Sequence, residues 1–163
     1  MVISYNWLKE YLPVAPEPEK LSQILTSIGL EVESMNAFES IKGGLKGLIV
    51  GEVIHCEKHP EADKLKLTRV NIGKDDLLNI VCGAPNVAVG QKVIVAPVGV
   101  TIYPIQGEPL TLKKAKIRGA ESEGMLCAED EVGLGNSHEG LFLLPDTLVP
   151  GTPISEVFSV YSD

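Results

Sequence analysis

The stretch LIVGEVIHCEKHPEADKLKLTRVNIG, residues 48 to 73, decides the fold that we expect for this chain. Its two halves are rich in β-branched and aliphatic residues, and a turn containing Pro60 separates them, which predicts two long strands. Gly51 in the first half predicts a strand that bends sharply to close a small barrel. The alternation of apolar and polar side chains from Leu65 to Val70 is imperfect, which predicts a β-bulge there.

Further β-rich runs follow, each bounded by glycine, proline or asparagine. They are LLNIVCG, KVIVAPVG, LTLKKAKIRG and GLFLLP. Five or six short strands in about a hundred residues predict a mainly β fold, either a small barrel or a sandwich. Because one strand is bent, we expect a five-stranded barrel of the oligonucleotide-binding (OB) type rather than an immunoglobulin-like sandwich.

The N-terminal part has a different pattern. Residues 4 to 12 and 19 to 29 carry apolar side chains at helical spacing, with stop signals at Pro13 and Gly29. LEVESM, residues 30 to 35, predicts a short strand. Two small helices and one strand bury little apolar surface. This incomplete half-domain should therefore expose an apolar patch or pack against another surface.

We thus expect three parts along the chain. Residues 1–41 form a small N-terminal α+β segment, residues 42–154 form the OB barrel, and residues 155–163 form a C-terminal tail leading toward further domains. A length of 163 residues and a hydrophobic content of 44% predict one good core and exclude a disordered protein.

The sequence also indicates the cellular compartment. No stretch approaches the ~20 apolar residues that a membrane-spanning helix requires. The three cysteines are odd in number and widely separated, which indicates reduced thiols rather than a disulfide framework. We expect a soluble cytoplasmic protein with no membrane partner.

The formal net charge of −8 argues against a protein whose whole surface binds nucleic acid. The charge is uneven, however: residues 1–41 hold two cations and six anions, whereas residues 42–154 hold twelve and fourteen. The cations of the barrel form two runs, namely Lys64, Lys66 and Arg69, and then Lys113, Lys114, Lys116 and Arg118. If these runs lie on neighbouring strands they form a basic stripe for phosphates; alternatively, they are solubilising charges at sheet edges.

The segment KIRGAESEGMLCAEDEVGLG, residues 116 to 135, is a candidate ligand surface. Lys116 and Arg118 can neutralise phosphates, and Ser122 can donate a hydrogen bond to a phosphate oxygen. Met125 offers a polarizable surface to a base. The alternative is a turn followed by core, with Met125 filling the end of the barrel.

Other candidate sites are weaker. Cys56 and His59 have a spacing that suits a metal, but zinc needs about four ligands and no second close pair exists. HPEADK, residues 59 to 64, is better interpreted as a turn between strands than as an acid–base site. His138 is interpreted as a loop residue. We expect no metal ligand and no catalytic residue in this chain.

Several segments, taken in order, resemble the N-terminal region of the bacterial phenylalanyl-tRNA synthetase β chain. They are MVISYNWLKEYL, IGLEVES, VGEVIHCEKHPEADKLKLTRVNIG, NIVCGAPNVAVGQKV, KKAKIRGAESEGMLCAEDEVGLG and GLFLLPDTLVPGTPISE. The resemblance covers nearly the whole chain. The central block alone also resembles the tRNA-binding barrels of methionyl-tRNA synthetases and of free-standing tRNA-binding proteins. The opening segments single out the phenylalanine enzyme.

The resemblance implies a tRNA-binding accessory region of a large β subunit. In that family the β subunit pairs with an α subunit in a heterotetramer and charges tRNA with phenylalanine, using ATP and magnesium. The adenylating site lies on α and the editing site lies later in β, so this part should be non-catalytic and hold no cofactor. Carried over residue by residue, the motifs imply RNA contacts by Lys64, Lys66, Asn86, Lys116, Arg118, Ser122 and Met125.

Aromatic side chains for base stacking are scarce, since only Tyr103 and Phe142 lie in the barrel segment. We therefore expect weak, sequence-tolerant and salt-dependent gripping of the tRNA backbone, with no binding of DNA. Two alternatives remain. The barrel could be a structural and interaction module with little RNA affinity, or the chain could be a self-standing tRNA-binding protein, against which the N-terminal helices argue.

Overall fold

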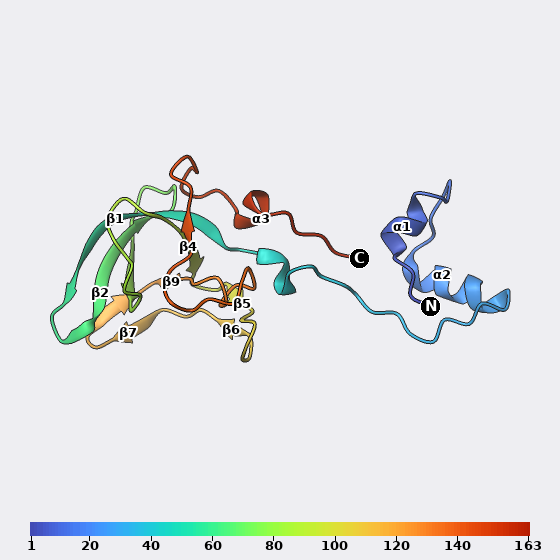
Figure 1. The fold of residues 1–163 in the computed structure, drawn as a ribbon, viewed down its shortest axis with the longest axis horizontal. Helices are drawn as coiled ribbons and strands as arrows, with labels where there is room; N and C mark the ends of the chain where they lie inside the picture. Colours follow the sequence, from blue (N-terminus) through green and yellow to red (C-terminus); the bar gives the residue numbers. More distant parts are fainter. The chain divides into compact units, whose positions relative to one another are not determined.

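The computed structural model describes residues 1–163, which divide into two compact units (Figure 1). The larger unit comprises residues 41–160, and the smaller unit combines residues 1–40 with residues 161–163. None of the helices has the length and apolar character that crossing a membrane demands.

The larger unit is built around a nearly closed antiparallel barrel (Figure 1). Its strands are β1 (Ile49–His59), β2 (Ala62–Asn71), β3 (Leu78–Cys82), β4 (Lys92–Pro97) and β9 (Gly124–Leu126). β1 pairs with β2 and β4, β2 pairs with β3, and β4 pairs with β9. The backbone N–H of Glu123 donates to the carbonyl of Asn79 at 2.8 Å, which closes the circle between β9 and β3. The predicted five-stranded OB-type barrel is thus confirmed.

Short elements surround the barrel. They are η1 (Lys42–Leu45), β5 (Thr101–Ile102), β6 (Leu110–Thr111), β7 (Ala115–Ile117), β8 (Ala120–Ser122), β10 (Leu143–Leu144) and α3 (Ile154–Val157). β5 pairs with β6, β7 pairs with β8, and β10 runs along β4 beyond β9. The run expected as one strand over residues 110 to 119 is therefore split between two hairpins. The fifth barrel strand is β9, within the segment that we considered as a ligand surface.

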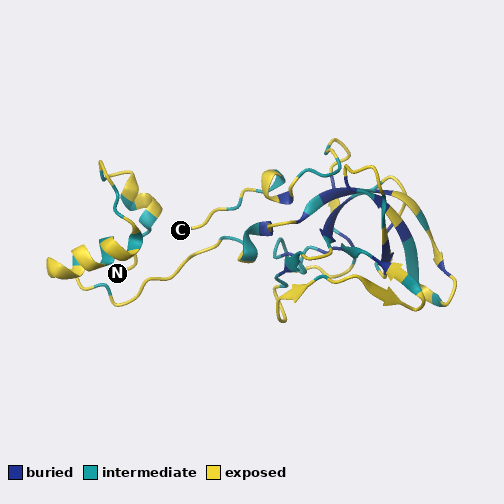
Figure 2. Ribbon diagram, turned by 180° about the vertical axis from the view of Figure 1, so that it is seen from behind, coloured by how far each residue is buried: buried dark blue, intermediate teal, exposed yellow.

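The core is aliphatic and lies on both faces of β4. Val93 and Val95 pack into one cluster of buried side chains, whereas Ile94 and Ala96 pack into another. Figure 2 shows this buried strand in dark blue. The second cluster is covered by α3, whose Ile154 is fully buried. Val157 and Phe158, which lie in the segment expected as a C-terminal tail, pack against the same cluster.

β1 carries the bend and one of two register irregularities. A Cβ atom on Gly51 would overlap the side chain of Val95 and lie 2.7 Å from Cγ1 of Val70, so only glycine fits where these strands meet. Ile54 is an extra residue in β1, because Val53 and His55 face consecutive residues of β2. The sequence predicts a bulge between Leu65 and Val70 of β2, but the irregularity opposite Arg69 and Val70 lies in β1. A second irregularity does lie in β2, where residues 63–65 have no paired residue in β1.

The smaller unit contains α1 (Tyr5–Lys9) and α2 (Pro18–Ser27). The predicted strand at residues 30 to 35 is wrong, because this segment has no strand partner and stays irregular. The extended pairing occurs later: Glu39 forms a bridge with Ser162. The Asp163 carboxylate also accepts a hydrogen bond from the backbone N–H of Asn6 at 2.7 Å.

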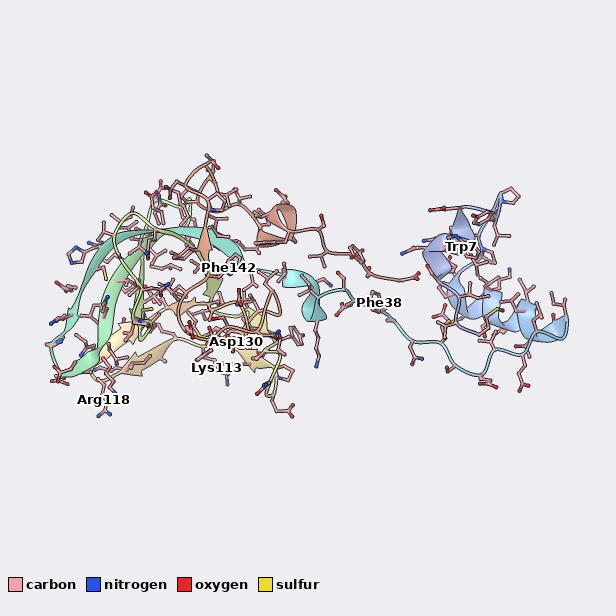
Figure 3. The ribbon with its side chains drawn as sticks, in the orientation of Figure 1. Trp7, Phe38, Lys113, Arg118, Asp130 and Phe142 are labelled. Atoms are coloured by element: carbon pink, nitrogen blue, oxygen red, sulfur yellow. The ribbon has the colours of Figure 1, made fainter.

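The smaller unit exposes apolar side chains, as expected for an incomplete half-domain. None of its residues is buried. The exposed apolar residues include Trp7, Tyr11, Ile24, Ile28, Leu30, Met35 and Phe38, of which Trp7 and Phe38 are labelled in Figure 3.

Substitution Gly51→Ala tests the constraint at the bend. The added methyl group has to displace β2 or β4, so we expect the free energy of unfolding to fall by about 1–3 kcal/mol. Urea denaturation measures this loss. Gly83→Ala is the matched control, because its Cβ would meet only Leu65 at 3.4 Å. Equal stability of the two variants would contradict the proposed constraint.

The three cysteines are free, as expected. Cys82 and Cys127 are buried, whereas Cys56 is half-buried. Burial raises the pKa of the Cys82 thiol and, more strongly, that of the Cys127 thiol. Both thiols are therefore protonated and unreactive at neutral pH.

We predict that iodoacetamide at pH 8 modifies Cys56 first in the folded chain. Cys82 and Cys127 should react only after unfolding, because reaction requires the thiolate and access to solvent. Mass spectrometry of peptides from native and urea-treated protein measures the order. Modification of all three cysteines at one rate in the native chain would refute the prediction.

Candidate nucleic-acid interface

Two of the predicted RNA-binding cations lie on the β7–β8 hairpin. Ile117 pairs with Ala120, which leaves Arg118 and Gly119 as the two turn residues. Their φ angles of +48° and +88° are those of a type I′ turn, which matches the twist of a hairpin. Arg118 is exposed and lies at the end of the hairpin (Figure 3). Lys116, one residue before Ile117, is also exposed.

The base of the hairpin is anchored to β3. The Ser122 hydroxyl accepts a hydrogen bond from the backbone N–H of Val81 at 3.1 Å and donates to the carbonyl of Gly124 at 3.1 Å. The Glu123 carboxylate accepts from the N–H of Asn79 at 3.2 Å. Ser122 is buried, so its predicted contact with a phosphate would require this anchor to open.

The charges of the hairpin are only partly compensated. The Lys114 ammonium lies 3.0 Å from the Glu121 carboxylate and 3.5 Å from that of Glu123. The hydrogen bond and charge of Glu121, followed by the charge of Glu123, raise the pKa of Lys114. The ion pairs of the hairpin thus occupy Lys114, whereas Lys116 and Arg118 form none. These two cations remain available for an external anion.

The structure brings Lys66 and Asn86 together at the loop between β3 and β4. The Lys66 ammonium donates to the carbonyl of Val87 at 2.9 Å, which fixes this loop. The Asn86 amide donates to the carbonyl of Leu141 at 3.1 Å and accepts from its N–H at 2.8 Å. Both side chains therefore hold the barrel together, and an RNA contact by either remains a prediction.

The last two predicted residues lie apart. Lys64 is exposed in the β2 bulge, beside the β1–β2 turn. Met125 lies in β9, half-buried against the core, which agrees with the alternative that it fills the barrel. Sequence reasoning did not select Lys58, which lies directly opposite Lys66. The pairing of the two strands across the turn was the signal that could have identified it.

A hollow of about 220 Å³ lies beside the β7–β8 hairpin, over β1, β2 and β3. Its polar lining includes His55, Glu57, Arg69, Asn79 and Glu121. Glu121 faces Lys116 across the hairpin, so the hollow borders the available cations. This strand face is where OB barrels bind oligonucleotides.

The remaining polar candidates are not gathered as the ligands of a metal ion. Cys56 and His59 gather no third ligand, because the chain contains no group of three or more His, Cys, Asp or Glu side chains suited to a metal ion. His138 is exposed, with Nδ1 3.0 Å from the Asp130 carboxylate. The hydrogen bond and charge of Asp130 raise the pKa of His138.

A comparison of the sequence with models of protein families agrees with this geometry. Residues 48–153, which span the barrel, fit a family model described as "putative tRNA binding domain". The chain belongs to this tRNA-binding family. The tRNA-binding barrel is therefore the part of the chain that carries Lys64, Lys116 and Arg118.

Comparison with whole proteins extends the match to the N-terminal segment. The chain is 52% identical over its whole length to the phenylalanine–tRNA ligase beta subunit of Bacteroides fragilis and 51% identical to that of Porphyromonas gingivalis. It is 45% identical to the Dickeya dadantii subunit over 96% of the chain. The tRNA-binding chain spans only about a fifth of the length of these relatives, 20% or 19%. The resemblance to an N-terminal region of the ligase β subunit is confirmed.

Solved structures similar to this chain include two proteins. The C-terminal domain of Plasmodium vivax p43 has 27% identity and a TM-score of 0.45 over 64% of this chain and 56% of that chain. The MetRS-related protein from Pyrococcus horikoshii has 26% identity and a TM-score of 0.46 over 64% of this chain and 85% of that chain.

Substitution Arg118→Asn separates the contribution of the Arg118 charge to tRNA binding from the contribution of residue 118 to the stability of the turn. Asparagine tolerates the left-handed conformation better than arginine, so we expect the free energy of unfolding to stay equal or to rise by up to about 1 kcal/mol. Affinity for tRNA should nevertheless fall, because one available cation is lost. Urea denaturation and fluorescence anisotropy measure the two effects. A stabilised variant with unchanged affinity would exclude Arg118 from the interface.

Proposed function

We propose that this tRNA-binding chain is an accessory region of a phenylalanine–tRNA ligase β subunit. It grips the backbone of tRNA without reading its sequence, while the whole enzyme attaches phenylalanine to tRNA-Phe. The observation that carries the proposal is that Lys116 and Arg118 are exposed and form no ion pair. Both lie on a hairpin that is anchored to the barrel. The names of the relatives and of the matching family support the choice of RNA.

The nature of the side chains favours phosphates over bases. Base stacking on an aromatic ring is worth about 1–3 kcal/mol per base, but the rings of the barrel are engaged elsewhere. The ring of Phe142 packs edge-on against Phe158 at 5.7 Å between centroids, and Tyr103 packs over Gly43. Binding should therefore be weak and strongly dependent on salt.

We propose that the whole ligase pairs its β subunit with an α subunit in a cytoplasmic heterotetramer that uses ATP and magnesium. No side-chain group in these 163 residues fits a magnesium ion. We assign no catalytic step to this chain, and its contribution is to position tRNA for chemistry performed elsewhere.

A second candidate function is a structural module with little RNA affinity. Lys66, Asn86 and Ser122 use their polar atoms in hydrogen bonds to the backbone of the larger unit, and the formal net charge is −8. A self-standing tRNA-binding protein is the third candidate, but the similarity to the ligase subunits also includes residues 1–40.

Charge reversal on the hairpin tests the proposed function. We expect Lys116→Glu/Arg118→Glu to abolish the binding of tRNA-Phe at physiological salt. It should also reduce the slope of log affinity against log salt by about 1.4–1.8, since each of the two lost phosphate contacts contributes about 0.7–0.9. Fluorescence anisotropy at several salt concentrations measures both quantities.

The control for this experiment is Lys20→Glu/Lys74→Glu, which changes the net charge equally at two exposed positions that do not belong to the hairpin. It should retain most of the affinity. If both double variants lose the same affinity, only net charge matters and the hairpin is not the site. If the unmodified chain fails to bind any tRNA at low salt, the structural module is the correct function.

A further inference from the structure

His59 is buried at a place where its neighbours are exposed. It ends β1 at the turn toward β2, and 4% of its surface is accessible, whereas Lys58, Pro60 and Glu61 are exposed. A turn between two strands does not by itself require a buried imidazole. The ring therefore has a role that the position in a turn does not explain.

Both ring nitrogens have partners, and the partners define the tautomer. Nδ1 accepts a hydrogen bond from the backbone N–H of Glu61 at 3.0 Å, so Nδ1 carries no proton. Nε2 lies 3.3 Å from the carbonyl oxygen of Ile117 and must donate its proton to it. The arrangement requires a neutral imidazole with its proton on Nε2.

The acceptor of this hydrogen bond lies between the two available cations. Ile117 is flanked by Lys116 and Arg118, and its strand belongs to a two-stranded sheet separate from the barrel. The adjoining turn is close as well, because a Cβ on Gly119 would lie 3.6 Å from the Glu61 carboxylate. Figure 1 shows the end of β7 beside the β1–β2 turn.

We infer that His59 is a positioning residue that holds the cationic end of the β7–β8 hairpin against the β1–β2 turn. This inference rests on the proposed function. The hairpin has strands of three residues and is anchored to β3 at its base, and such a short two-stranded sheet is marginal alone. Without the bond to Ile117, the cations sample several positions, and RNA binding has to order them.

Two substitutions of His59 separate its two hydrogen bonds. His59→Asn keeps an acceptor for the N–H of Glu61 but lacks the reach to Ile117. His59→Gln keeps a donor at the position of Nε2. If His59 positions the hairpin, affinity for tRNA-Phe should fall about threefold to tenfold in His59→Asn and stay within about twofold in His59→Gln. If the imidazole serves only its own turn, the order of the two variants is reversed and the inference is overturned.

A double-mutant cycle connects the effect to the cations. Added to Lys116→Glu/Arg118→Glu at low salt, His59→Asn should produce no further loss of affinity. An additional loss of the same size would show that His59 acts elsewhere and would overturn the inference. Failure of the charge reversal to weaken binding would instead overturn the proposed function, so the two failures are distinguishable.

Nitrogen-15 NMR of the unmodified chain provides a test that does not depend on the folding of a variant. The His59 ring should be in the neutral form with its proton on Nε2, and the Nε2 proton should be protected from exchange with water. A protonated Nδ1, or rapid exchange at Nε2, would overturn the inference.

Discussion

The barrel depends on one position at which no side chain can be accommodated. At Gly51, β1 is in contact with β2 through Val70 and with β4 through Val95, and both valines occupy the space of a Cβ atom. The close approach allows a single strand to belong to both halves of the sheet. β2 and β3 follow on one side, and β4 and β9 follow on the other, so the two halves can meet at the far side of the barrel.

The candidate interface is attached at that meeting point. The backbone bond between Glu123 and Asn79 closes the barrel, and the adjoining Ser122 fixes the base of the β7–β8 hairpin. The closure of the fold and the placement of the cations thus share the same few residues. A change that loosens the closure will also displace Lys116 and Arg118, so stability and RNA affinity are coupled at this corner.

Local signals predicted the barrel, and long-range pairing accounts for what they missed. Gly51 and the alternating runs predicted the bent strand and the fold class, because bending and alternation are properties of one strand. β9 was missed as a strand because three residues obtain their extended form only from pairing with β4. The strand expected at residues 30 to 35 was lost for the converse reason, since no neighbouring strand pairs with it.

In the candidate site, too, local features were predictable from the sequence and long-range contacts were not. Exposed lysine and arginine at the hairpin were predictable from composition and spacing. The internal bonds of Asn86 to Leu141, and of His59 to Ile117, join residues more than fifty positions apart, and neither leaves a local pattern. The bridge between Glu39 and Ser162 joins residues more than twice as far apart in the sequence, and it has a consequence for biosynthesis. The ribosome releases the first helices long before the segment that joins them, so the smaller unit completes its folding only after the whole barrel has been synthesised.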